Sequence, residues 1–180
     1  MARALVGLLL LLPALTQMAL AAAGSTALPE LTLQDQEGRT LQFEALRGRV
    51  AIIVYGGRAG VEEHSAWGKR LDAELRQRGV YRAEDAEADR PVRILAVAEM
   101  GGIPEAFRPL IRTAVRPGVE KGYSLWLDWE DRMTRAFGAH EPHSTVLVAD
   151  REGAVLLVVG GAPTGGPLQA VVDLLRRLLP

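Results

Sequence analysis

Histidine and carboxylate side chains are the groups of this chain with the widest chemical use. All three histidines have acidic residues beside or near them, and the set is Glu62, Glu63, His64, His140, Glu141 and His143. Imidazole and carboxylate groups are common ligands of zinc and copper(II). The favoured interpretation is that solvent-exposed loops simply collect polar residues, so no cofactor is expected. The alternative is a zinc or copper site held by His64, His140 and His143.

A glycine-rich turn, Gly56-Gly57-Arg58-Ala59-Gly60, precedes the first of these acidic segments. Backbone N–H groups at such a turn can bind an anion at a helix N-terminus, and the Arg58 guanidinium would assist. The turn lacks the Gly-Lys-Ser/Thr ending of a phosphate-binding loop, and Glu62 and Glu63 would repel an anion. The stronger interpretation is that the glycines form the turn and the two acids stabilise the helix dipole.

Thiol chemistry is excluded by composition, because the chain contains no cysteine. Disulfide exchange and peroxide reduction need a thiolate, and no other side chain forms a disulfide or a sulfenate. The four methionines cannot run a disulfide cycle. We therefore expect no thiol-dependent turnover.

The elements that must position these residues alternate between strands and helices, which is typical of an α/β protein. Apolar runs predict strands over residues 50–55, 92–97 and 123–127, and hairpins over 31–43 and 145–159. Apolar residues at helical spacing predict helices over 61–77, 104–115 and 130–137, and a last helix that opens at Pro167. Pro109 predicts a kink or a late start in the second helix.

Three segments, residues 28–38, 46–50 and 141–153, resemble parts of thioredoxin-like proteins of the thiol–disulfide oxidoreductase and thiol-specific antioxidant type. The resemblance covers essentially the whole chain after residue 23. It implies a thioredoxin-like fold, with a central mixed β-sheet flanked by helices and an N-terminal β-hairpin. It also implies that the bond before Pro142 is cis and that this proline faces the start of the first helix.

The same resemblance places the redox motif of the family on Gly60, Val61, Glu62 and Glu63. Gly60 and Glu63 stand at the two cysteine positions, so the motif is degenerate. The chain is also similar to cysteine-free periplasmic proteins of the YtfJ type, in which a Gly-Arg turn replaces the redox motif as Gly57-Arg58 does here.

In this fold the loop around the cis-proline presents backbone groups to an extended peptide, so a member without cysteines can keep recognition. We therefore expect an extended peptide or protein partner, in a chaperone-like or scaffolding role, bound by Arg58, Glu141, Pro142 and His143. A metal-binding protein is the alternative, because the resemblance places the three histidines at one end of the sheet. An enzyme of unrelated acid–base chemistry ranks third.

The first 23 residues have the pattern of a secretory signal: Arg3 in a basic start, an apolar core too short to span a bilayer, and Ala21-Ala22-Ala23 before Gly24. They predict export to the periplasm or the extracellular space, with one domain over residues 24–180. No second apolar run reaches membrane-spanning length, so the mature chain is expected to have no membrane span. A formal net charge of −1 and the lack of a basic cluster argue against nucleic acid as a partner.

Aromatic residues gather around Asp128, at Tyr123, Trp126 and Trp129, and Trp67 lies in the first predicted helix. Most such residues pack in a core or at its edge. A partner-binding patch would require two of the tryptophans to be exposed together.

Overall fold

Strand β4 (Val50–Gly56) lies inside a mixed sheet, and all of its residues are buried. Its nearly continuous apolar sequence suits a strand that is covered on both faces. It pairs in parallel with β5 (Val92–Glu99) and antiparallel with β7 (Thr145–Ala149).

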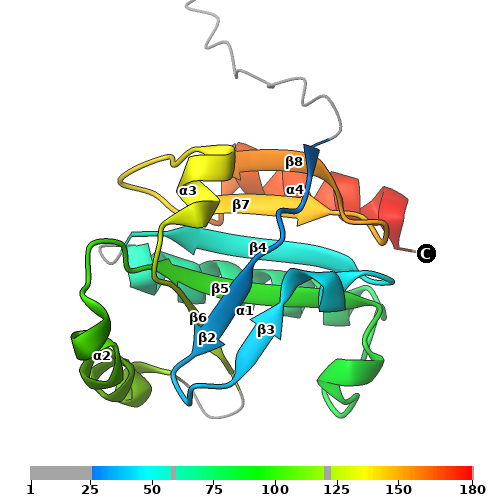
Figure 1. Cartoon of the computed structure of the whole chain (residues 1–180). Coiled ribbons are helices and arrows are strands. Elements are labelled where there is room, and N and C mark those ends of the chain that lie inside the picture. The colour runs from blue at the N-terminus through cyan, green and yellow to red at the C-terminus, as the bar shows by residue number, and fades with distance from the viewer. Residues whose placement is uncertain (1–25, 58–59, 120–122, 180) are drawn as a thin grey trace, which may run out of the picture.

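The computed structural model describes residues 26–57, 60–119 and 123–179. Over these residues the sheet has eight strands in the order β1-β8-β7-β4-β5-β6-β2-β3 (Figure 1).

The remaining strands complete the two ends of the sheet. They are β1 (Thr26–Ala27), β2 (Thr32–Asp35), β3 (Thr40–Gln42), β6 (Leu125–Asp128) and β8 (Ala154–Gly160). The predicted N-terminal hairpin is confirmed as β2 and β3, which pair antiparallel. Its turn is held by the buried Asp35 carboxylate, which accepts the backbone N–H groups of Glu37 and Arg39.

Helices cover both faces of the sheet, as Figure 1 shows. Helices α1 (Val61–Gln77) and α4 (Gly165–Leu178) pack behind it in this view, and their shared core includes Trp67, Leu71 and Val171. Helix α3 (Arg132–Phe137) and the hairpin lie in front. Helix α2 (Arg108–Val115) lies beyond β6. The short 3-10 helices are η1 (Phe43–Leu46), η3 (Glu87–Asp89), η4 (Glu105–Phe107) and η5 (Arg116–Gly118).

The predicted elements are present, with shifts at their ends that have local causes. The second helix starts late, as Pro109 predicted, because η4 precedes α2 and the proline stands in its first turn. Helix α3 begins at Arg132 rather than at residue 130, since Asp131 adopts a left-handed conformation with φ 49°. Strand β1 has only two residues and was not predicted.

No helix in the described part of the chain is long and apolar enough to cross a bilayer. The predicted signal over residues 1–23 lies outside the described residues.

Candidate functional site

The start of α1 lies against the loop between α3 and β7, which contains Pro142. The Glu141–Pro142 peptide bond is cis, as the sequence resemblance implied. The Glu63 carboxylate, in the first turn of α1, accepts a hydrogen bond from the backbone N–H of Ser144. Its other oxygen lies 3.1 Å from the Nδ1 of His143. These contacts hold the proline loop to the helix.

Glu63, which the sequence resemblance places at a cysteine position of the redox motif, therefore has a structural role here. Burial alone would raise the pKa of Glu63, but the hydrogen bonds from the Ser144 backbone and from His143 outweigh burial, and the pKa is lowered. The carboxylate is thus kept ionised, which is the form that accepts hydrogen bonds at both oxygens. The sequence did not single out Ser144, although it directly follows the predicted binding residue His143.

His64 is a core residue and not an exposed ligand. Its side chain is 1% exposed, and neither ring nitrogen has a hydrogen-bond partner in the described part of the chain. Its Nε2 lies 3.0 Å from where a Cβ on Gly56 would stand and 3.4 Å from the same point on Gly60. Because the two glycines have no side chain, there is room beside them for the His64 imidazole. A larger residue at Gly56 would collide with the ring.

Burial lowers the pKa of His64 to about 4, although the charge of Glu63 and the nearby Tyr55 carbonyl act in the opposite direction. His64 is therefore neutral at neutral pH.

The three histidines have different surroundings. The Nδ1 of His140 lies 3.2 Å from the Oγ1 of Thr145, and its ring packs over the bare α-carbon of Gly160. His143 is on the surface beside Glu63, while His64 is below it in the core. Within the described residues, no group of three or more histidine, aspartate or glutamate side chains is placed to hold a metal ion. The zinc or copper site considered on His64, His140 and His143 is thus not formed there.

Glu141 is exposed, as are the neighbouring loop residues His140, Pro142 and His143. The Oε1 of Glu141 lies 3.4 Å from where a Cβ on Gly57 would stand, so the side chain lies close to Gly57. No other described residue hydrogen-bonds the backbone N–H or carbonyl of Glu141. Arg58, also predicted to bind, lies outside the described residues.

The aromatic residues do not form the patch considered from the sequence. Trp67 is 0% exposed and Trp126 is 6% exposed, so both belong to the core. Trp129 is partly buried beneath the Arg108 guanidinium, which lies 5.3 Å from the centre of its ring. Two tryptophans are therefore not exposed together.

A second group of polar residues, which sequence reasoning missed, lies where β5 and β6 end, beside the start of α3. The Glu99 carboxylate at the end of β5 accepts hydrogen bonds from the backbone and the hydroxyl of Thr134. Asp128 accepts the backbone N–H of Met133. Burial raises the pKa of Glu99, and the neighbouring Asp131 and Asp128 add to this effect against the Thr134 hydrogen bonds. These acids fix the start of α3.

Comparison with solved structures identifies the fold. The exposed lipoprotein thioredoxin Etrx1 of Streptococcus pneumoniae matches 81% of this chain and 98% of its own, with a TM-score of 0.58 and 13% identity. A SCO1/SenC family lipoprotein of Bacillus anthracis matches 89% of this chain and 99% of its own, with a TM-score of 0.58 and 12% identity. Neither the family models nor the curated proteins compared with the sequence gave a match.

The chain therefore has the thioredoxin-like α/β fold, and it carries that fold without a cysteine. The structure places Gly60 as the N-cap of α1 and Glu63 in its first turn. Those are the positions that the sequence resemblance gave to the two redox residues.

Cysteines restored at these two positions are expected to form an internal disulfide. In the double variant Gly60→Cys/Glu63→Cys, both thiols would lie in the first turn of α1, where the helix N-terminus favours a thiolate. Mass spectrometry after mild oxidation should show the loss of two hydrogens without dimer formation. Gly60→Cys/Glu62→Cys is the matched control and should stay reduced. A folded Gly60→Cys/Glu63→Cys protein with two free thiols would contradict the assigned positions.

Proposed function

We propose that this protein binds an extended segment of a partner polypeptide along the proline loop, and that it does so without thiol chemistry. The observation that carries the proposal is the exposed Glu141, whose backbone N–H and carbonyl are unpaired among the described residues. An extended peptide can pair with such groups as a strand adds to a sheet edge.

Contacts from α1 fix the conformation of the proline loop before a peptide binds. The Glu63 carboxylate holds the backbone of Ser144 and the ring of His143, so little loop ordering remains to be done on binding. Preorganisation of this kind favours affinity because it lowers the entropy cost of association. Glu63 therefore supports recognition at a position that serves redox chemistry in proteins with cysteines.

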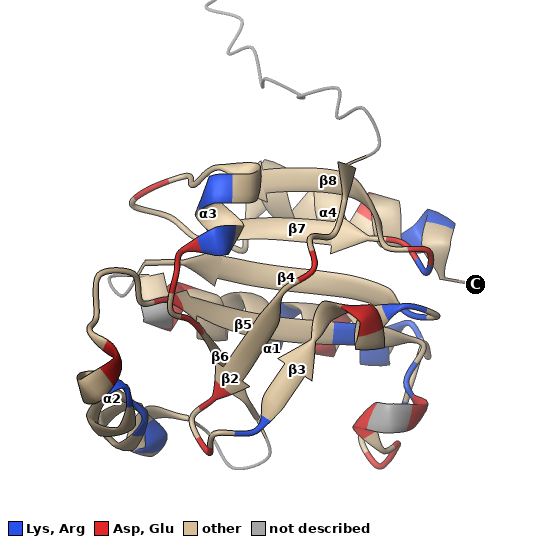
Figure 2. Ribbon diagram, viewed as in Figure 1, with Lys and Arg blue, Asp and Glu red and all other residues tan. Residues whose placement is uncertain are grey.

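The acidic side chains around the site indicate the charge of the peptide that would bind. Glu62 and Glu141 are exposed on the two sides of the site, and in Figure 2 the loop between α3 and β7 carries an acidic segment and no basic one. Lysine or arginine in the bound peptide would be attracted to these carboxylates, whereas acidic peptides would be repelled. We propose a basic or neutral extended peptide as the ligand.

Residues 1–23 support the further proposal that the protein is exported and acts in the periplasm or the extracellular space as one domain over residues 24–180.

The proposal is tested by fluorescence anisotropy with two short unstructured peptides that differ only in carrying lysines or glutamates at the same positions. The lysine peptide should bind more tightly. Glu141→Lys should weaken its binding about fivefold, the size of one or two surface charge interactions. Glu84→Lys makes the same charge change on an exposed loop residue outside the site, and should leave binding almost unchanged. Equal effects of the two variants, or binding of neither peptide, would overturn the proposal.

A further inference from the structure

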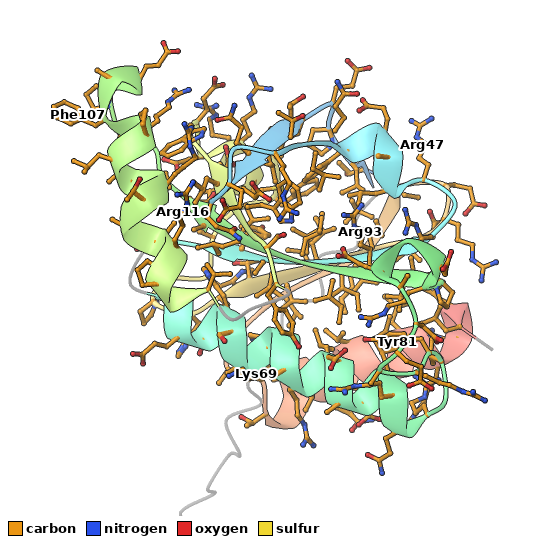
Figure 3. The ribbon with its side chains drawn as sticks, turned by 90° about the horizontal axis from the view of Figure 1, so that it is seen from below. Arg47, Lys69, Tyr81, Arg93, Phe107 and Arg116 are labelled. Carbon is orange, nitrogen blue, oxygen red and sulfur yellow. The ribbon has the colours of Figure 1, made fainter. Side chains whose placement is uncertain are left out.

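A groove of about 600 Å³ runs along α1, from His64 in its first turns to Tyr81 beyond its end. It lies between α1, strands β5 and β6, and the region of η5. Figure 3 shows this side of the molecule, with Lys69 on α1 and Tyr81 beyond the end of that helix. The volume is within the range of small-molecule sites, about 300–1,000 Å³.

Most of the groove is apolar. Its lining includes Ile94 and Ala96 of β5, Met100 and Leu125. Gly68 lines it from α1, and a Cβ built on Gly68 would meet nothing within 4 Å. The missing side chain at Gly68 therefore keeps part of the groove open.

One end of the groove is polar and carries more positive than negative charge. The Asp72 carboxylate accepts the Tyr81 hydroxyl at 2.8 Å and pairs with the Arg76 guanidinium. Arg90 lies 4.0 Å from the same carboxylate and 4.5 Å from the centre of the Tyr81 ring. Two guanidinium groups thus share one carboxylate.

The other charged residues that line this end do not change the balance. Glu87 is paired with Arg93, at 3.0 Å. Burial and the adjacent Asp72 raise the pKa of the Tyr81 hydroxyl, so it stays neutral. The polar end therefore suits an anion, and the apolar floor suits a hydrocarbon body.

We propose that this groove binds a small monocarboxylic acid, with its apolar part over Ile94 and Ala96 and its carboxylate at the Arg76 and Arg90 end. The Arg90 guanidinium would then gain a second carboxylate partner, which matches its planar hydrogen-bonding geometry. Arg76 is in the last turn of α1 and Glu63 in its first turn, so the charged end of the groove lies away from the proposed peptide site and does not depend on it.

The test uses octanoate, 1-octanol and octylammonium as probes in calorimetric titrations of the full protein. They share one hydrocarbon chain and differ in head-group charge. Octanoate should bind at one site and about tenfold more tightly than octanol, while octylammonium should bind more weakly than either. Arg90→Gln should weaken octanoate about fivefold and leave octanol unchanged. Equal binding of the three probes would overturn the proposal.

Gly68→Leu tests the position of the site. The leucine side chain would fill open space in the groove, and leucine is a better helix former than glycine. Octanoate affinity should fall at least tenfold, whereas Ala66→Leu, at an exposed position of the same helix, should leave it unchanged. Peptide binding should be the same in both variants. Undiminished octanoate binding by Gly68→Leu would place the acid elsewhere and overturn the proposal.

Discussion

The free energy of unfolding is expected to fall by about 3 kcal/mol as the pH is lowered from neutral to about 4, because His64 is buried in its neutral form. The ordinary pKa of histidine, 6.5, applies to the unfolded chain, and burial lowers the pKa of His64 to about 4 in the folded protein. Between pH 6.5 and about 4, His64 is protonated in the unfolded chain but stays neutral in the folded protein. The stability is therefore complete above pH 6.5 and is lost progressively as the pH falls toward 4.

Replacing His64 by leucine should remove this part of the pH dependence. Leucine is similar in size to histidine and carries no proton. At neutral pH it should be at least as stable as the original residue, because the two ring nitrogens of His64 have no partner among the described residues. Urea unfolding of both proteins across the pH range gives the comparison.

The free energy of unfolding is plotted against pH for the original protein and for His64→Leu. The difference between the two curves separates the effect of His64 from that of the other groups that titrate nearby. The lowered pKa of Glu63 also costs stability at low pH, but only below its ordinary value of 4.5, and the raised pKa of Glu99 acts in the opposite direction. Both groups are present in both proteins. A His64→Leu protein whose free energy of unfolding falls with pH as steeply as that of the original protein would show that His64 is not buried as described.

Trp67→Ala is expected to lower the free energy of unfolding by about 3–5 kcal/mol, the usual cost of truncating a fully buried aromatic residue. The Trp67 side chain is 0% exposed, and its indole N–H donates to the Gly161 carbonyl at 2.8 Å. Its loss would leave a cavity between α1 and the sheet and an unpaired carbonyl after β8.

Trp129→Ala is the matched control, because this indole is partly exposed and packs beneath the Arg108 guanidinium. Chemical denaturation should show less than half the Trp67→Ala effect. A similar loss in both variants would contradict the assignment of Trp67 to the core.

The fold could be predicted where pattern and packing agree. Helix α1 begins and ends at the residues that its apolar spacing indicated, and β4 was recognised from its continuous apolar run. The ends of other elements depend on contacts between distant residues. Near its start, helix α3 is held by the Glu99 carboxylate of β5, which accepts the backbone N–H of Thr134, and β1 exists because two residues pair with β8. Neither contact leaves a local signal in the sequence.

The candidate site was predicted in part. The cis bond before Pro142 and the place of Glu63 follow from the resemblance, whereas the shared histidine site does not form. One signal could have shown this, because His64, Trp67, Leu71 and Leu75 have the spacing of a single helix face and all four are buried. The His140 ring contacts Thr145 and Gly160 whereas the His143 ring contacts Glu63, and the sequence gives no signal for these contacts.

The central claim is that the proline loop and the start of α1 form one binding site that is independent of cysteine. It is tested most directly by backbone amide NMR of the isotope-labelled full chain during titration with the lysine peptide. The predicted result is a set of shifts at residues 60–63 and 140–144, reduced in Glu141→Lys and retained in Glu84→Lys. Shifts confined to other surfaces, or no shifts at saturating peptide, would contradict it.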